Sequence, residues 1–151
     1  MNRVADYLFA ICITLWVGAL WAVGFLTAPV LFHELADKTL AGNLAGKLFA
    51  IIAWLGIGSA AYALLYVLAR QGARSLKTAV FWLIFLMLLL TLAGHFGVTP
   101  VIAQLKAEAL PREVMESVLK DRFVAWHGVS SVLYLIQSVL GIALVTQIYR
   151  R

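Results

Sequence analysis

Three observations on the sequence predict an all-α integral membrane protein built as a four-transmembrane-helix bundle. Of the 151 residues, 64% are hydrophobic and 13% are charged, whereas a soluble domain is nearer to about half apolar and about a quarter charged. The apolar residues form four runs, each long enough for the roughly 20 residues that cross a bilayer. Backbone groups inside hydrocarbon must be satisfied within their own segment, so each run is expected to be a helix.

The four runs fill most of the chain and leave no room for a separate soluble domain. We therefore expect a single membrane domain over residues 1–151, with spans at about 7–32, 48–69, 79–103 and 123–149. The first run is too long for a signal peptide, and no small-residue cleavage site ends it. The lone Cys12 cannot form an intrachain disulfide.

Two of the connections have an apolar face at helical spacing. In residues 33–47, Leu40 and Leu44 repeat every four residues, which predicts a short amphipathic turn or helix on the surface. In residues 110–122, an apolar face lies opposite a charged one, which predicts a short amphipathic helix on the surface between the third and fourth spans. Residues 70–77 are expected to form a tight basic loop.

Small residues and tryptophans inside the spans predict close helix packing. The stretch from Gly56 to Ala61 would let a neighbouring backbone approach closely. Trp16 and Trp21 fall near the middle of the first span, where they would pack against other helices or line a pocket. Pro29 is expected to kink or end that span.

The last span carries a polar face. His127, Ser131, Tyr134 and Ser138 are spaced i, i+4, i+7 and i+11, and Gly128 lies next to the first of them. Strongly polar groups in hydrocarbon usually face a bundle interior or a wet cavity. The face therefore indicates either helix packing, with His127 at the membrane interface, or one wall of a pocket.

The charge distribution favours one orientation. With four spans, both termini and the 70–77 loop share a side, and each side carries six Lys and Arg residues. Only Asp6 is acidic on the terminal side, while the other side holds six acidic residues. The short, acid-free 70–77 loop favours cytoplasmic termini. The basic residues form no patch in polar surroundings, so nucleic acid is not an expected partner.

In that orientation, all three histidines fall towards the outer side. His33 ends the first span, and His95 and His127 lie one to two turns inside the third and fourth, at the level of Pro29 and Pro100. Three histidines at one depth could ligate a metal or haem, or relay protons. Alternatively, His33 is a solvated cap, and His95 and His127 hydrogen-bond to neighbouring helices. No catalytic motif is present, so enzymatic activity stays open.

A weak internal repeat relates the two halves of the chain. Pro29-Val-Leu aligns with Pro100-Val-Ile at an offset of 71 residues. Three residues of the second span align with Gly128, Ser131 and Tyr134 at an offset of 72. Two hairpins in parallel orientation would give such an offset, as in some transporters.

Several stretches resemble a known family. Residues 15–21 (LWVGALW), 28–32 (APVLF) and 41–49 (AGNLAGKLF) are similar to the bacterial domain of unknown function 4149. Residues 99–106 (TPVIAQLK) and 122–131 (RFVAWHGVSS) resemble the wider transmembrane protein 205-like family. The resemblance implies a small four-helix inner-membrane protein without an established biochemical activity. It also implies that position 95 is more often asparagine than histidine.

Three functions follow as hypotheses. The first is a binding or accessory module in the bacterial inner membrane, with a polar pocket near the outer surface. Its partners would be the lipid bilayer and a second copy of the chain in a homo-oligomer. The second is a haem- or copper-binding redox protein that uses His127 with His95 or His33. The third is a small oligomeric transporter.

Overall fold

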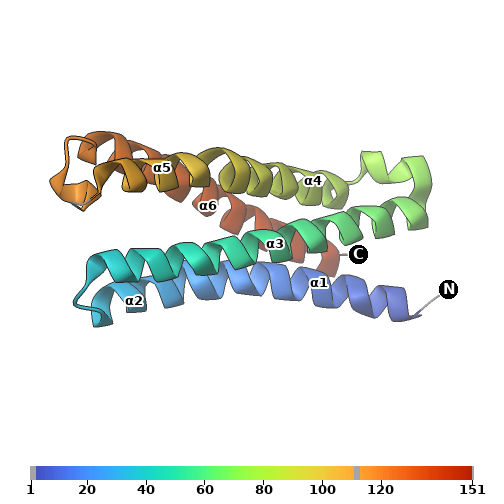
Figure 1. The fold of residues 1–151 in the computed structure, drawn as a ribbon. Coiled ribbons are helices and arrows are strands. Elements are labelled where there is room, and N and C mark those ends of the chain that lie inside the picture. Colours follow the sequence, from blue (N-terminus) through green and yellow to red (C-terminus); the bar gives the residue numbers. More distant parts are fainter. Residues whose placement is uncertain (1–2, 111–112, 151) are drawn as a thin grey trace.

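The computed structural model describes residues 3–110 and 113–150, which form four long helical stretches joined by short connections (Figure 1). The stretches are Arg3–Glu34, Lys38–Lys77, Ala79–Ala109 and Lys120–Tyr149, and each is long and apolar enough to cross a membrane. Every expected span falls inside one of them. The prediction of an all-α protein with four membrane-length helices is therefore confirmed.

The first and third stretches each contain a π-helical segment. The first consists of α1 (Arg3–Trp21), a π segment (Ala22–Thr27) and α2 (Ala28–Glu34). The second consists of α3 (Lys38–Gln71) and a 3-10 turn (Gly72–Lys77). The third consists of α4 (Ala79–Leu92), a second π segment (Ala93–Val98) and α5 (Thr99–Ala109). A short 3-10 turn (Val114–Glu116) precedes α6 (Lys120–Tyr149).

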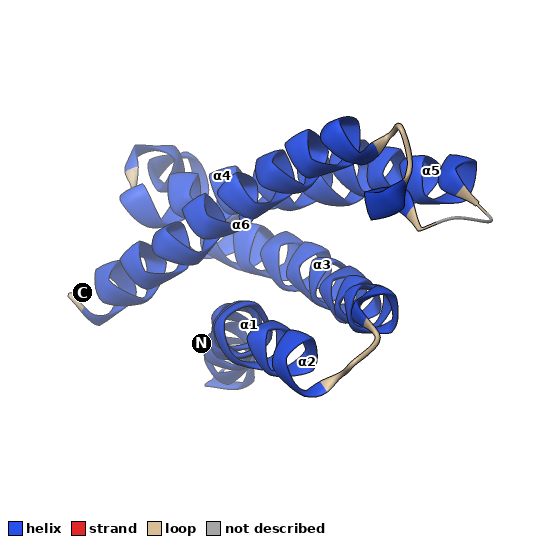
Figure 2. Ribbon diagram, turned by 90° about the vertical axis from the view of Figure 1, so that its left-hand side faces the viewer, coloured by secondary structure: helices blue, strands red, loops and turns tan. Residues whose placement is uncertain are grey.

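The helices pack in chain order. The helix α1 contacts α3, α3 contacts α4, α4 contacts α6, and α6 crosses back to reach α1. Figures 1 and 2 show this oblique crossing of α6. Both chain ends lie towards one end of the bundle, called here the terminal end (Figure 1). Residues 35–37 and 113–119 lie at the opposite, distal end (Figure 1).

The core lies where α1, α3, α4 and α6 cross. Its fully buried large side chains are Trp16, Leu20, Ile84, Met87 and Leu144. The predicted close packing at Gly56 is confirmed, because a Cβ atom there would stand 2.5 Å from the Trp16 indole nitrogen.

Polar contacts at the terminal end join α1 to α3. Asp6 forms an ion pair with Arg70, and the Tyr66 hydroxyl donates to Asp6 Oδ1 at 2.6 Å. The Tyr62 hydroxyl donates to the Ala5 carbonyl at 3.1 Å. These contacts fix the register between the two helices.

The π segments explain how the helices continue past Pro29 and Pro100. A proline has no N–H, and its ring clashes with the carbonyl four residues back. In both stretches the residue before the proline donates instead to a carbonyl five residues back. Of the two expectations for Pro29, a kink or a helix end, the helix end is wrong, because helix continues to Glu34. The two segments lie 71 residues apart, which supports the internal repeat.

The expectation for residues 38–47 is corrected, and the amphipathic helix expected between the third and fourth spans is not seen in the described residues. Residues 38–47 are not a separate surface element but the first turns of α3, which begin after Asp37 accepts from the Leu40 N–H at 2.9 Å. In the 110–122 region, Pro111 and Arg112 lie outside the described residues, and Val114–Glu116 forms only one 3-10 turn before α6 begins.

A side chain explains why residues 114–119 do not form an α-helix. The Ser117 hydroxyl donates to the Val114 carbonyl at 2.8 Å and accepts from the Leu119 N–H at 3.2 Å. Such local bonds compete with helix. The apolar Val118, at 99% exposure, finds no packing partner in the described structure that would favour a helix.

Candidate functional site

The polar face of α6 divides into a buried part and an exposed part. In the buried part, the Tyr134 hydroxyl donates to the Leu20 carbonyl at 2.6 Å, and the Gln137 amide donates to Thr91 Oγ1 at 2.6 Å. The Ser138 carbonyl accepts from the Trp21 indole at 3.2 Å. These groups are paired within the bundle, so this buried part joins α6 to α1 and α4.

Tyr134 also fixes the first π segment. A Cβ atom at Gly24 would stand 2.2 Å from the tyrosine ring, so only glycine fits there. The ring of Phe49 meets Tyr134 edge-on at 5.0 Å. Tyr134 is therefore a packing residue at the point where α1 passes into the π segment.

The exposed part of the face holds His127, Gly128 and Ser131. The Ser131 hydroxyl donates to the His127 carbonyl of its own helix at 2.9 Å. The imidazole of His127 stacks on Phe123 with ring centres 5.9 Å apart. Pro29 and Pro100 are exposed as well, and their structural role lies in the π segments.

The structure does not bring the three histidines together. His33 pairs with the adjacent Glu34 at 2.9 Å and is largely exposed. His95 packs edge-on against Trp54, with ring centres 5.3 Å apart. Within residues 3–110 and 113–150, no three His, Cys, Asp or Glu side chains are grouped so that they could hold a metal ion. A site that uses all three histidines is therefore not assembled in this part of the chain.

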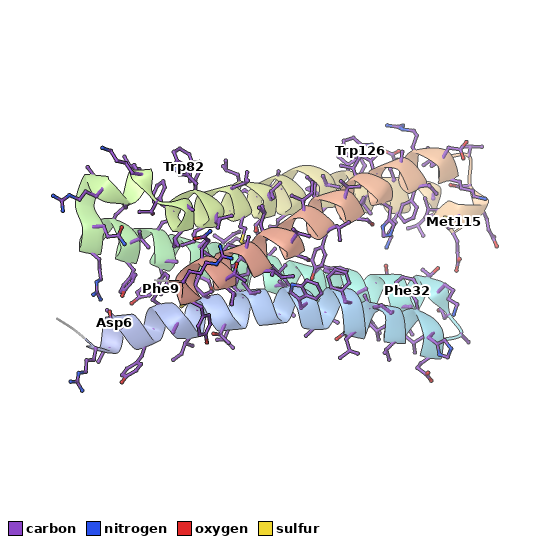
Figure 3. All side chains as sticks on the ribbon, turned by 180° about the vertical axis from the view of Figure 1, so that it is seen from behind. Asp6, Phe9, Phe32, Trp82, Met115 and Trp126 are labelled. Carbon is purple, nitrogen blue, oxygen red and sulfur yellow. The ribbon has the colours of Figure 1, made fainter. Side chains whose placement is uncertain are left out.

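A second group of residues gathers at the distal end, around Lys106 of α5. The ammonium donates to Asn43 Oδ1 of α3 at 3.1 Å and stands 6.0 Å from the ring centre of Phe123 in α6. A Cβ atom at Gly42 would lie 3.9 Å from the same ammonium and 3.7 Å from the ring of Phe32. These five residues, Phe32, Gly42, Asn43, Lys106 and Phe123, are called here the distal cluster. In Figure 3, Phe32 lies at the end opposite Asp6.

The distal cluster holds a positive charge without a carboxylate partner. In the described residues the ion pairs are His33 with Glu34 and Asp6 with Arg70. The acid nearest in sequence to Lys106, Glu108, accepts from the Gln104 amide at 2.7 Å. Lys106 is half-buried, and its polar contact within the described chain is the neutral Asn43.

Sequence reasoning missed the distal cluster, although signals for it were present. Lys106 is a lone cation near the end of an apolar helix, and Asn43 is a lone amide in an apolar stretch. Of the five stretches that resemble the family, four each contain at least one residue of the distal cluster. Imidazole is a commoner ligand than an amide or an ammonium, so the sequence pattern favours the histidines. His127 contacts the cluster through its stacking on Phe123.

A shallow apolar groove lies elsewhere, between α1 and α6. Its volume is about 320 Å³, and it is lined by Val17, Trp21, Ile142, Val145 and Thr146. It runs towards the terminal half, away from the distal cluster. Hydrocarbon suits it better than a polar ligand.

Comparison with known proteins supports one of the two resemblances. A family model described as "Domain of unknown function (DUF4149)" matches residues 11–110, well over half of the chain. The match includes Phe32, Asn43 and Lys106 and ends before α6. The wider resemblance at 122–131 therefore stays a prediction. Comparison with curated proteins and with solved structures gave no match.

Proposed function

The chain belongs to the DUF4149 family, and we propose from its geometry that it is a multi-pass inner-membrane binding or accessory module. Its ligand site is the distal cluster, which we place near the outer surface. The observation that carries this proposal is the Lys106 ammonium, held between α3, α5 and α6 with a neutral amide as its hydrogen-bond partner. This site replaces the histidine-centred pocket as the first region to test.

The energetics of a partly buried cation support a binding role. A charged side chain near hydrocarbon is costly unless an opposite charge or polar groups compensate it. An ammonium has three N–H donors, and one of them is used by Asn43. A bound anion would accept from the others and supply the missing negative charge.

The charge pattern and the exposed apolar residues support the orientation. The connection at 70–77 is short, basic and free of acidic residues, so we place it and both termini in the cytoplasm. The apolar Leu110, Met115 and Val118 are exposed in the other connection, which we place on the outer membrane surface. With Cys12 replaced by alanine, an impermeant maleimide should label Val118→Cys in intact cells. It should label Arg74→Cys only after lysis, and the reverse pattern would invert the orientation.

Native mass spectrometry tests the binding site. The detergent-purified protein should carry a non-covalent species that is lost in Lys106→Ala and kept in Lys47→Ala. Lys47 is the matched control, because it is an exposed lysine one turn from Asn43 on α3. The same spectra report the oligomeric state.

Two outcomes would contradict the proposal. One is a protein without any bound species, and the other is a species that survives Lys106→Ala. An absorption spectrum and an elemental analysis of the same samples test the redox alternative. Haem or copper that is lost in His127→Ala and retained in Lys106→Ala would replace the binding module with a redox protein.

A further inference from the structure

We propose that the distal cluster binds the phosphate group of an anionic lipid from the outer leaflet. This inference rests on the proposed function and names the class of ligand for the same site.

The donors suit a phosphate oxygen pair. The Lys106 ammonium keeps two N–H groups beyond the one that bonds to Asn43 Oδ1. Because the Asn43 oxygen accepts that bond, its amide NH₂ remains as a neighbouring donor. Asn43 is exposed, so a ligand can reach this amide from outside the bundle. A phosphodiester presents two free oxygens, which match an ammonium and an amide side by side.

The depth of the cluster suits a headgroup. Lys106 lies three residues before the end of α5 at Ala109, about 4.5 Å along the helix axis at 1.5 Å per residue. This places the ammonium just inside the end of a membrane-length helix, where lipid phosphates are found. Lysine side chains near helix ends commonly extend to this level.

The surroundings favour a lipid over a free anion. The ring of Phe123 lies near the ammonium, and the ring of Phe32 lies on the other side of Gly42's Cβ position; both rings offer apolar surface to the upper part of an acyl chain. The distal connections are rich in both acidic and basic residues and form no broad positive field. Attraction of soluble anions from a distance is therefore weak, and the bilayer itself supplies the phosphate at high local concentration.

Spin-label electron paramagnetic resonance provides the test. The full chain is reconstituted in phosphatidylcholine vesicles with spin-labelled phosphatidylglycerol or spin-labelled phosphatidylcholine, and the fraction of immobilised lipid is compared. We expect a roughly fivefold preference for the anionic lipid, the equivalent of about 1 kcal/mol. Lys106→Ala should abolish this preference, whereas Lys106→Arg and Lys47→Ala should retain it.

Each alternative outcome has a defined meaning. Loss of the preference for the anionic lipid in both Lys106→Ala and Lys47→Ala would show a general effect of positive charge. It would contradict a specific lipid site at the distal cluster. Displacement of the spin-labelled lipid by inorganic phosphate would assign the cluster to a soluble anion. Absence of any preference in the wild-type protein would also overturn the lipid assignment.

If native mass spectrometry then still found a Lys106-dependent species, the binding module would stand with another ligand. Circular dichroism confirms that each variant is folded.

Discussion

The terminal and distal halves of the bundle are built differently. The terminal half and the centre contain Trp16, Ile84, Met87 and Leu144, all fully buried. In the distal half, the described buried side chains include three alanines, Ala41, Ala45 and Ala109, together with Val98 and Leu105. Neither the first π segment nor α2 contributes a buried residue. Large side chains packed against glycines hold one half together, whereas the contacts between helices in the other half include the hydrogen bond of Lys106 to Asn43.

This difference separates stability from binding. A densely packed region has little room for a ligand, because its groups already contact one another. The distal half has exposed donors, aromatic edges and a cation without a carboxylate partner among the described residues. Substitutions in the terminal half should therefore change the free energy of unfolding, whereas substitutions in the distal cluster should change what the protein binds.

The largest expected effect is at Trp16. Replacement by alanine would leave a cavity between α1 and α3 and lower the free energy of unfolding by about 3–5 kcal/mol. Reversible unfolding in mixed micelles, followed by circular dichroism, measures this change. Trp54→Ala is the control, because Trp54 is 59% exposed. An equal loss of unfolding free energy in both variants would contradict the contrast between a packed and an open region.

A smaller effect is expected at Gly24. Alanine there would place its Cβ atom 2.2 Å from the Tyr134 ring, and the overpacking should cost about 1–3 kcal/mol. Gly18→Ala is the matched control in the same stretch. Apart from its chain neighbours and the nearby backbone of its own helix, no described atom lies within 4 Å of a Cβ atom at residue 18. In a Tyr134→Ala background the Gly24→Ala cost should vanish. Additive effects of the two substitutions would show that the ring is not the obstacle.

The smallest effect is expected at the Tyr134 hydroxyl. Tyr134→Phe removes the 2.6 Å hydrogen bond to the Leu20 carbonyl, and such bonds between membrane helices average about 0.6 kcal/mol. Ser131→Ala provides the comparison, because the Ser131 hydroxyl bonds within its own helix and should change stability less. A loss above about 2 kcal/mol for Tyr134→Phe would mean that the buried polar part of α6 is more important for stability than its geometry indicates.

The sequence was sufficient to predict the number and placement of the long helices, because hydrophobic length alone determines what can cross a bilayer. It also indicated the close approach at Gly56. It could not indicate that Gly24 faces Tyr134, since that contact joins residues 110 positions apart. The distal cluster was missed for the same reason: Asn43, Lys106 and Phe123 meet only through the relative rotation of three helices.

The paired π segments have a consequence for helical phase. A π turn contains one more residue than an α turn, and each residue of an α-helix advances by about 100° around the axis. Side chains after Thr27 and after Val98 are therefore displaced by about that angle relative to an unbroken helix. Phe32 and Lys106 both follow a π segment. A helical wheel that places the side chains of the distal end therefore has to begin anew at residues 28 and 99. Because both π segments insert one residue, the side chains of α2 and of α5 are rotated about their helix axes in the same direction.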